Sequence, residues 1–495
     1  MNIRLTAVAA LILIAMTFPV LAHAGAPHIP CEYPFVFSEA AVNLVVLPYD
    51  DSAISEASAR GSGTQLALLL QMDALSHILG YGNVGAIQLE LTPGDRTPCN
   101  VDDVAAKILG QRSGAQTQIR RGNGVVFVWG LMYEEDDDLY VQTYARFLRR
   151  DATEELLFAA GEYKLIAKPS SQLITFAPRH LSKKDLDRIE AAYLKANVVR
   201  QWKSDSAPGE ELHGIAKCGG CPPDSRPDGF LVVDRQEDWI QIRRRLPNGQ
   251  VQDGWIHANT GTMDFELDRQ LPELGFLEGT VGYLHSRVDA DNKREPAEEA
   301  GRLTAQQFAT FAKFADQNNE TVALAVAEQL AGITGMLSSR NYLEALTQAQ
   351  VSFNRARQLV PYSPDAITLS AATELNRATL ARNAGEPVTI ENPRLVAQQL
   401  AQASALAPAS NIAINNLSSY YKVARTANYK GDAANRLEKP EIEQQIQRIE
   451  NRRPPAVERF HESDTHPEQP RTDVLDLKKV VIPALPQTRK DIAPR

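Results

Sequence analysis

The hydrophobic pattern of this chain changes character once, between residues 262 and 268. Before that point, short apolar runs alternate with turns and isolated helical stretches; after it, Ala, Leu and Gln recur at helical spacing. A chain of 495 residues also exceeds what one hydrophobic core usually holds. We therefore expect a multidomain α+β protein with a signal peptide at 1–24, a small mixed α/β domain at 25–180, a connecting helix at 181–204, a small all-β SH3-like barrel at 205–262, an α-helical domain at 268–450 and a disordered Pro-rich tail at 451–495.

The first residues have the pattern of an export signal. Arg4 supplies positive charge, residues 5–21 are largely apolar, and Ala22-His23-Ala24 has the small-x-small form of a cleavage site. A membrane anchor is the alternative, but the apolar run is short and contains Pro19. We expect cleavage after Ala24, a periplasmic or secreted mature protein, and no transmembrane segment after cleavage.

Composition and motifs weigh against several classes of function. A net charge of −9 and a pI near 5.6 argue against general binding to nucleic acid, which requires a basic face. The common motifs of hydrolases, zinc proteases, P-loop proteins and dinucleotide-binding proteins are missing from the sequence. Gly61-Ser62-Gly63 before a helix is a weak anion-binding signal. We expect a non-enzymatic protein with no cofactor and no metal.

The four cysteines would meet an oxidising compartment after export. Sequence separation favours a Cys31–Cys99 staple and a tight Cys218–Cys221 loop. The Cys-Gly-Gly-Cys sequence also permits thiol redox chemistry, which requires the first cysteine at a helix N-terminus. Because Pro222-Pro223 follow directly, a structural loop is the favoured interpretation.

The first domain shows alternating strand and helix patterns. The expected elements are a buried strand at 42–47, a helix at 66–78, a strand at 84–92, a helix from 100 to 109, a hairpin of 124–133 with 139–148, one further strand at 154–165, and an amphipathic helix at 180–200 with Ser182 as N-cap. Five acidic residues at 134–138 separate the hairpin strands. They lack the spacing of a calcium loop, so we expect a solvated hairpin tip.

The run from Asn123 to Leu157 resembles a known α/β domain. The strand ending at Gly130, the polar turn, and the continuation Ala145-Arg146-Phe147 followed by 151–156 are similar to the domain shared by the curli-secretion channel lipoprotein, the flagellar outer-membrane assembly lipoprotein and the N-terminal part of the Tol-system propeller protein. The resemblance covers about residues 40–165 and implies a role in outer-membrane assembly or secretion. It brings no catalytic residues.

Residues 205–262 resemble a bacterial SH3-like (SH3b) domain. The similarity runs through Asp238 to Ile242, the turn Asn248-Gly249, and Gly254 to Ala258. It implies a ligand groove for peptide or cell-wall material, lined by Trp239 and Arg243, with Trp255 packing within the barrel. The alternative is that Trp239 only covers the open end of the barrel.

The helical half resembles degenerate tetratricopeptide repeats. Asn341-Tyr342 and Ala345-Leu346 are similar to the start of a repeat's second helix, and Ala356 with Pro361 is similar to its exit. A second exit at Ala403 and Pro408 has the same internal spacing. The resemblance implies a concave surface for a protein partner; a plain helical bundle is the alternative.

Three functions remain open on these grounds. The first is a non-enzymatic envelope scaffold that binds peptidoglycan or peptide through Trp239, Arg243 and Trp255, and a protein partner through the helical half. The second is an accessory protein of outer-membrane assembly or secretion. The third is a thiol-redox protein that uses Cys218 and Cys221.

Overall fold

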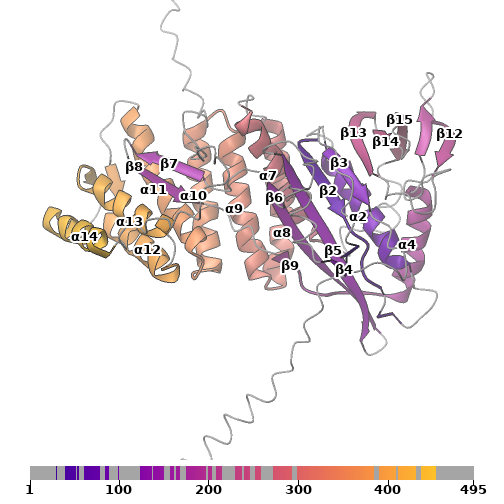
Figure 1. The fold of residues 1–495 in the computed structure, drawn as a ribbon, viewed down its shortest axis with the longest axis horizontal. Helices are drawn as coiled ribbons and strands as arrows, with labels where there is room; N and C mark the ends of the chain where they lie inside the picture. The colour runs from indigo at the N-terminus through magenta and orange to yellow at the C-terminus, as the bar shows by residue number, and fades with distance from the viewer. Residues whose placement is uncertain are drawn as a thin grey trace, which may run out of the picture.

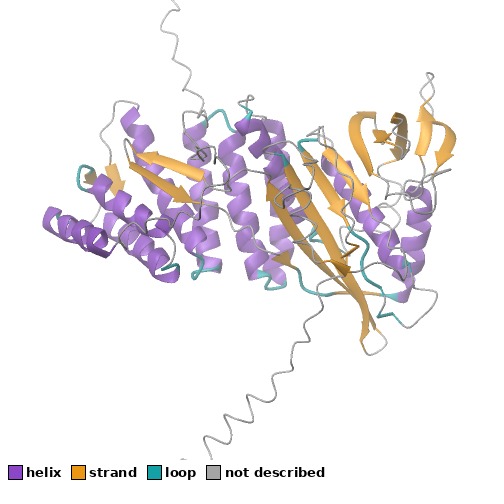
Figure 2. Cartoon of the chain, viewed as in Figure 1, coloured by secondary structure: helices purple, strands orange, loops and turns teal. Residues whose placement is uncertain are grey.

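The computed structural model describes the larger part of the chain. The described residues are 29–30, 40–51, 53–54, 61–78, 84–88, 98–99, 123–135, 138–149, 156–160, 163–167, 174–196, 199–202, 208–213, 229–236, 239–245, 251–257, 271–292, 298–383, 389–408, 411–430 and 436–452. The predicted signal peptide, the helix at 100–109 and the tail beyond 452 lie outside them. The protein is α+β: one large mixed sheet stands beside an elongated array of helices (Figures 1 and 2).

Three parallel strands form the centre of the sheet. β2 (Val42–Val46) pairs in parallel with both β3 (Val84–Gln88) and β5 (Gly124–Glu135), and α2 (Ser62–Ile78) lies in the chain between β2 and β3. Every residue of β2 is buried, as its unbroken apolar run requires for a central parallel strand. The predicted strand at 42–47, helix at 66–78 and strand at 84–92 are thus confirmed, the last one shorter than expected.

The longest strands form the predicted acidic-tipped hairpin. β5 pairs antiparallel with β6 (Asp138–Arg149) from Gly124 opposite Arg149 to Glu135 opposite Asp138. Residues of β6 alternate between buried and half-buried, so one face of the hairpin points into the core. The short strands β9 (Ile174–Thr175) and β10 (Arg179–Leu181) pair with the outer edge of β6.

Gly130 provides the space for an aromatic ring on this hairpin. A Cβ at this position would fall inside the ring of Tyr49, and 2.6 Å from the carbonyl oxygen of Gln142. The buried Tyr49 hydroxyl shares a hydrogen bond of 3.0 Å with the Thr143 hydroxyl on the neighbouring strand. Gly130, the last residue of the "VFVWG" run, therefore leaves the space that the Tyr49 ring occupies.

The sheet continues into the segment that resembles an SH3-like domain. β13 (Gly229–Gln236) pairs antiparallel with β3, and β14 (Trp239–Arg245), β15 (Val251–His257), β11 (Val199–Trp202) and β12 (Pro208–His213) follow in order. The β13–β14–β15 meander matches the predicted strands. The prediction of a separate barrel at 205–262 did not include the pairing with β3, and β11 already begins at residue 199. These strands belong to an 11-stranded sheet shared with the α/β unit.

The helical half is an array in which successive helices contact one another. Its members are α7 (Leu274–Asp291), α8 (Glu298–Gln317), α9 (Thr321–Ser338), α10 (Tyr342–Leu359), α11 (Pro364–Asn383), α12 (Pro393–Leu406), α13 (Asn411–Ala424) and α14 (Lys439–Arg452). α7 is buried on nearly all sides because it contacts β2, β5 and β6 as well as α8 and α9. It joins the array to the sheet (Figure 1).

Local sequence signals set where these helices begin and end. Asn341 caps α10 by accepting a hydrogen bond from the Glu344 amide and donating one of 2.9 Å to the Glu344 carboxylate. α10 ends at Leu359 before Pro361, and α12 ends at Leu406 before Pro408. The predicted exits are therefore helix ends. Ser182 likewise precedes α4 (Lys183–Ala196) and donates to the Asp185 carboxylate, as the connecting helix required.

A β-hairpin from the first third of the chain lies on the far part of the array. β7 (Leu156–Ala160) and β8 (Tyr163–Ala167) pair only with each other among the described strands. β7 contacts α11, and β8 contacts α11 and α13 (Figure 1). The single strand predicted at 154–165 was wrong, because β7 and β8 pair antiparallel with Ala160 opposite Tyr163. An isolated hairpin requires such support, since two strands alone are marginally stable in water.

Replacing Gly130 by Ala tests the packing of Tyr49. The added methyl group has to displace the Tyr49 ring, so we expect a loss of about 1–3 kcal/mol in the free energy of unfolding. Gly335→Ala is the control, because a Cβ at Gly335 would meet no atom within 4 Å. That variant should be neutral or up to about 1 kcal/mol more stable. Urea unfolding of both variants checks this, and equal stabilities would contradict the assigned packing.

Candidate functional site

The three residues expected to form the SH3-like groove lie on one face of two paired strands. Trp239 and Arg243 are on β14, and Trp255 on β15 lies opposite Gln241 between them. Trp239 is half-buried, Trp255 is buried, and Arg243 is exposed. Arg243 forms a bidentate ion pair with Asp253 on the same face, at 2.8 and 3.1 Å. This face thus carries an aromatic side chain and, about 13 Å further along the same strand, a neutralised cation.

Of the cysteines, only Cys99 lies within the described residues. β1 (Ile29–Pro30) pairs antiparallel with β4 (Pro98–Cys99), with Ile29 opposite Cys99. This register places the two residues before Cys31 alongside Pro98 and Cys99. The Cys31–Cys99 disulfide itself stays a prediction, because Cys31 lies outside the described residues. Cys218 and Cys221 lie outside the described residues, and their pairing stays a prediction as well.

The Gly-Ser-Gly segment at the start of α2 binds a carboxylate of the chain itself. The amides of Gly61 and Gly63 donate to Asp51 at 2.7 and 3.1 Å. The positive end of the helix is therefore satisfied internally. The Gly-Ser-Gly pattern indicated an anion at this helix start, and the anion in the structure is the carboxylate of Asp51.

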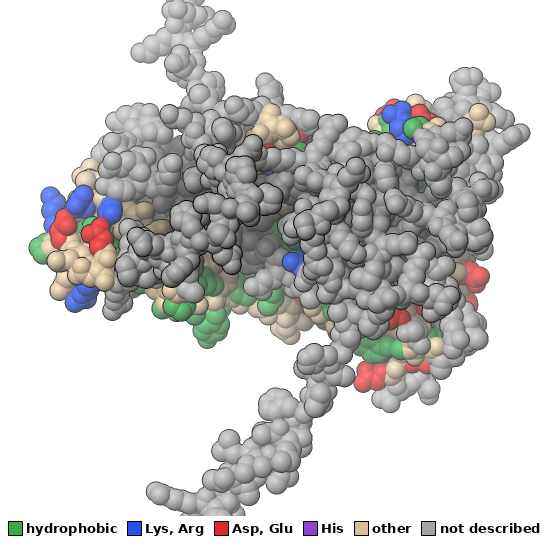
Figure 3. All heavy atoms as spheres, in the orientation of Figure 1, with side chains coloured by type: hydrophobic (Ala, Val, Ile, Leu, Met, Phe, Trp, Pro, Cys, Tyr) green, Lys and Arg blue, Asp and Glu red, His purple; other side chains and the backbone are tan. Residues whose placement is uncertain are grey.

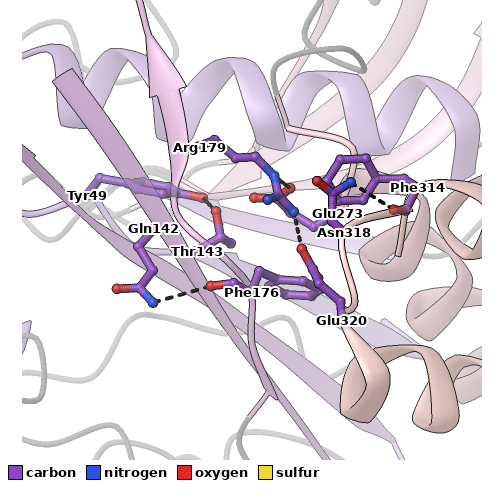
Figure 4. A network of polar contacts seen from close by, with 9 residues as sticks. All are labelled: Tyr49, Gln142, Thr143, Phe176, Arg179, Glu273, Phe314, Asn318 and Glu320. Atoms are coloured by element: carbon purple, nitrogen blue, oxygen red, sulfur yellow. Dashed lines mark hydrogen bonds and ion pairs between the residues drawn. The ribbon is translucent and has the colours of Figure 1, made fainter. Parts of the chain in front are cut away.

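A buried cluster of charges joins the sheet to the helical array (Figure 4). Arg179 on the edge strand β10 forms an ion pair with Glu320, the residue just before α9, and its Nε lies 3.7 Å from Glu273, the residue just before α7. Its guanidinium also lies 4.1 Å from the centre of the Phe314 ring on α8. One side chain of the sheet thus contacts three helices.

The charge balance of this cluster explains an unusual carboxyl group. Two carboxylates share one guanidinium, and the Glu273 side chain is fully buried. Burial raises the pKa of Glu273 to about 7, against the opposing attraction of Arg179. A neutral Glu273 leaves Arg179 and Glu320 as a balanced pair. Burial also raises the pKa of the neighbouring Tyr49, which stays a neutral phenol.

Stability should depend on pH through Glu273. Burial raises the pKa of Glu273 in the folded state above its value in the unfolded state, so the unfolded chain loses this proton first. The stability contributed by the protonated carboxyl group is fully present below the unfolded pKa, and it is lost as pH rises through about 7. We expect the unfolding free energy of the wild type to fall by roughly 2 kcal/mol between pH 5 and pH 8 from this group. In Glu273→Gln this part of the pH dependence should disappear. Urea unfolding at both pH values measures it.

Glu190→Gln is the matched control for this experiment, because Glu190 is exposed on α4. It should retain the pH dependence of the wild type. If Glu273→Gln retained it too, the assignment of a neutral Glu273 would be wrong.

A concavity lies between α8, α9 and α10. It has a volume of about 820 Å³ and extends along the axes of these helices. α9 forms its floor with small side chains, and α8 and α10 form its two walls. The floor residues are Ala327, Ala331, Gly332, Gly335 and Ser338; the α8 wall includes Ala305, Ala309 and Ala312, and the α10 wall includes Ala345, Gln348 and Ser352.

Two glycines on the groove floor have different surroundings. A Cβ at Gly332 would lie 2.7 Å from the Phe353 ring of α10, so Gly332 is needed for helix packing. A Cβ at Gly335 would meet open space. A mid-helix glycine costs about 1 kcal/mol relative to alanine. At Gly335 packing within the chain does not account for that cost, and its effect is to keep the groove deep.

Charged side chains lie at both ends of this groove. Glu298 on α8 and Glu344 on α10 line one end together with Arg302. At the other end Arg355 pairs with Glu328 at 3.0 Å and with Asp316 at 3.7 Å, so three helices are tied by one guanidinium. An apolar, narrow floor between polar ends is the chemistry of a site for a polypeptide segment with flanking charges.

The remaining surface adds mixed charges and scattered apolar groups. Figure 3 shows Lys, Arg, Asp and Glu together at the α14 end and hydrophobic side chains along the lower edge of the array. Tyr362 and Val351 are among the most exposed apolar residues. α9 is long and apolar enough to cross a bilayer, but two thirds of it is buried, as in a helix at the centre of a folded array. Within the described ranges no His, Cys, Asp and Glu cluster suits a metal ion.

Comparison of the chain with protein-family models, with curated proteins and with solved structures finds no match. The functional interpretation therefore depends on the geometry of the described residues. Sequence reasoning expected a concave partner surface on the helical half but did not place it between α8 and α10. The signal that could have placed it is the recurrence of alanine at 305, 309 and 312 on a helix otherwise polar on that side; Ala305 and Ala309 are exposed and Ala312 is half-buried.

Proposed function

We propose that this protein is a non-enzymatic scaffold that binds a polypeptide segment in the groove between α8 and α10. The observation that carries the proposal is Gly335: a helical glycine with open space above it, on the floor of an 820 Å³ concavity. We take the helical array as degenerate tetratricopeptide-like repeats, in line with the resemblance of residues 341–364. The groove is then the concave surface that such arrays present to partners.

The groove chemistry favours a peptide over a small molecule. Its walls follow α8 from Glu298 to Asp316, a distance of about 27 Å at the rise of an α-helix. Small side chains on the floor admit branched aliphatic groups of a partner, whose burial contributes about 25 cal/mol per Å². The end charges then favour one direction of the bound chain.

Gly335→Leu tests this function. A Cβ at this position meets no atom within 4 Å and the side chain extends into the groove, so we expect nearly unchanged thermal stability and loss of peptide binding. Phage display of random 12-residue peptides on the wild-type protein, followed by affinity measurement on both proteins, is the experiment. We expect selected peptides to bind Gly335→Leu at least ten-fold more weakly. Selected peptides that bind both proteins equally, or the absence of any enriched sequence, would contradict the proposal.

Leu343→Ala is the matched control for the peptide measurement. Leu343 is 52% exposed on α10 and does not line the groove. This variant removes exposed apolar surface of similar size from the same array. Its peptide affinity should equal that of the wild type.

We propose a second contact surface on the SH3-like strands. The observation that favours it is the half-buried Trp239 on the same strand face as Arg243, which Asp253 already neutralises. An aromatic ring with a paired cation suits a neutral or mixed-charge ligand such as peptide or peptidoglycan.

Trp239→Ala should abolish sedimentation of the protein with isolated peptidoglycan, and Val251→Ala, an exposed site on β15, should not. Failure of the wild type to sediment would remove the wall ligand.

We infer a periplasmic or secreted location from the signal at residues 1–24, with a protein partner in the cell envelope. The α/β sheet is consistent with the resemblance to the curli, flagellar and Tol-type domains.

An accessory role in outer-membrane assembly or secretion is the alternative function. A thiol-redox role would depend on Cys218 and Cys221, which lie outside the described residues. Insulin reduction by the purified protein would support that role.

A further inference from the structure

The sequence beyond α14 contains a segment whose chemistry matches the groove. α14 ends at Arg452, and residues 477–490 read LKKVVIPALPQTRK, with four basic side chains and no acidic one. We propose that the groove between α8 and α10 binds residues 480–487 of the protein's own C-terminal segment, which then competes with any external peptide. This inference rests on the proposed function, since it names an occupant of the same groove.

Length and conformation support this occupant. Pro483 and Pro486 exclude a helix across the segment and favour an extended backbone. Eight extended residues cover about 26 Å, close to the groove length of about 27 Å along α8. Val481, Ile482 and Leu485 supply branched aliphatic side chains for a floor made of alanine and glycine.

Charge supports it as well. Carboxylates exceed cations among the groove residues, with Glu298, Asp316, Glu328 and Glu344 against Arg302, Lys313 and Arg355. Arg302 is engaged by Glu299 outside the groove, which makes this face more acidic. The excess lies at the end with Glu298 and Glu344, because Asp316 and Glu328 at the other end are paired with Arg355. Lys478-Lys479 and Arg489-Lys490 flank the segment, so either direction of binding brings a basic pair to the acidic end.

The connection is long enough. About 28 residues join Arg452 to Val480, with an average reach of about 30 Å as a flexible chain and about 90 Å when extended. From α14 to α10 there are four helix-to-helix steps of about 9 Å each. A tethered segment within this reach has an effective concentration near millimolar, so even a weak site is largely occupied.

The test is photocrosslinking within the full-length chain. Benzoylphenylalanine replaces Ile482, and dilute protein is irradiated, digested and analysed by mass spectrometry. We expect crosslinks within one chain to residues of α8, α9 and α10, and their loss in Gly335→Leu. The same probe at Val457 is the control and should not reach the groove. Crosslinks elsewhere, crosslinks only between two copies, or none at all would overturn the proposal.

A binding measurement separates this inference from the proposed function. A fluorescent peptide of residues 474–490 should bind the triple variant Val481→Glu, Ile482→Glu, Leu485→Glu at least ten-fold more tightly than the wild type, because the tethered competitor is removed. Equal affinity of the two proteins overturns the tail proposal alone, if display-selected peptides still require Gly335. Should no peptide require Gly335, both proposals fail.

Discussion

The contact of Arg179 with Glu273 and Glu320 fixes the relation between the two halves of this protein. The arginine comes from the edge of the sheet, and the two glutamates directly precede α7 and α9. Phe176, Phe276 and Phe311 pack edge to face around this cluster, with ring centres 5.3 to 5.7 Å apart. One contiguous apolar core therefore runs from β2 in the sheet to Ile449 in α14 among the described residues. The sheet and the array thus share one core.

This continuity matters for the groove. A binding surface made by three helices keeps its shape only if their spacing is fixed, because preorganised sites spend less free energy on ordering. α7 contacts both the sheet and the first helices of the array. Phe353 packs against Gly332 beneath the groove floor, and Arg355 joins α8, α9 and α10 at one end of the groove. The walls are thus fixed at the base and at one end. Gly335 lies on the floor between them.

Local patterns in the sequence were sufficient for much of the fold. The all-buried β2, the alternating β6, the cap at Asn341 and the helix end before Pro361 are each set by residues within a few positions of one another. The pairing of β3 with β13 was not predictable, since it joins segments about 140 residues apart with no shared pattern. The concave surface expected on the helical half could not be placed for the same reason: Ala309 and Gly335 are ordinary core-type residues until the helices are placed side by side. The neutral state of Glu273 requires knowledge of its burial, which sequence alone does not provide.

The hairpin β7–β8 carries a consequence for how the chain reaches this structure. Its contacts on α13 link residues separated by about 250 positions, and the strands on either side of it, β6 and β9, belong to the sheet. During synthesis the hairpin emerges long before the helices that support it. We therefore expect α11 and α13 to pack onto the β7–β8 hairpin late in folding, and contacts between residues so far apart in sequence make that step slow. A nascent chain released before α13 is made would lack the contact between β8 and α13.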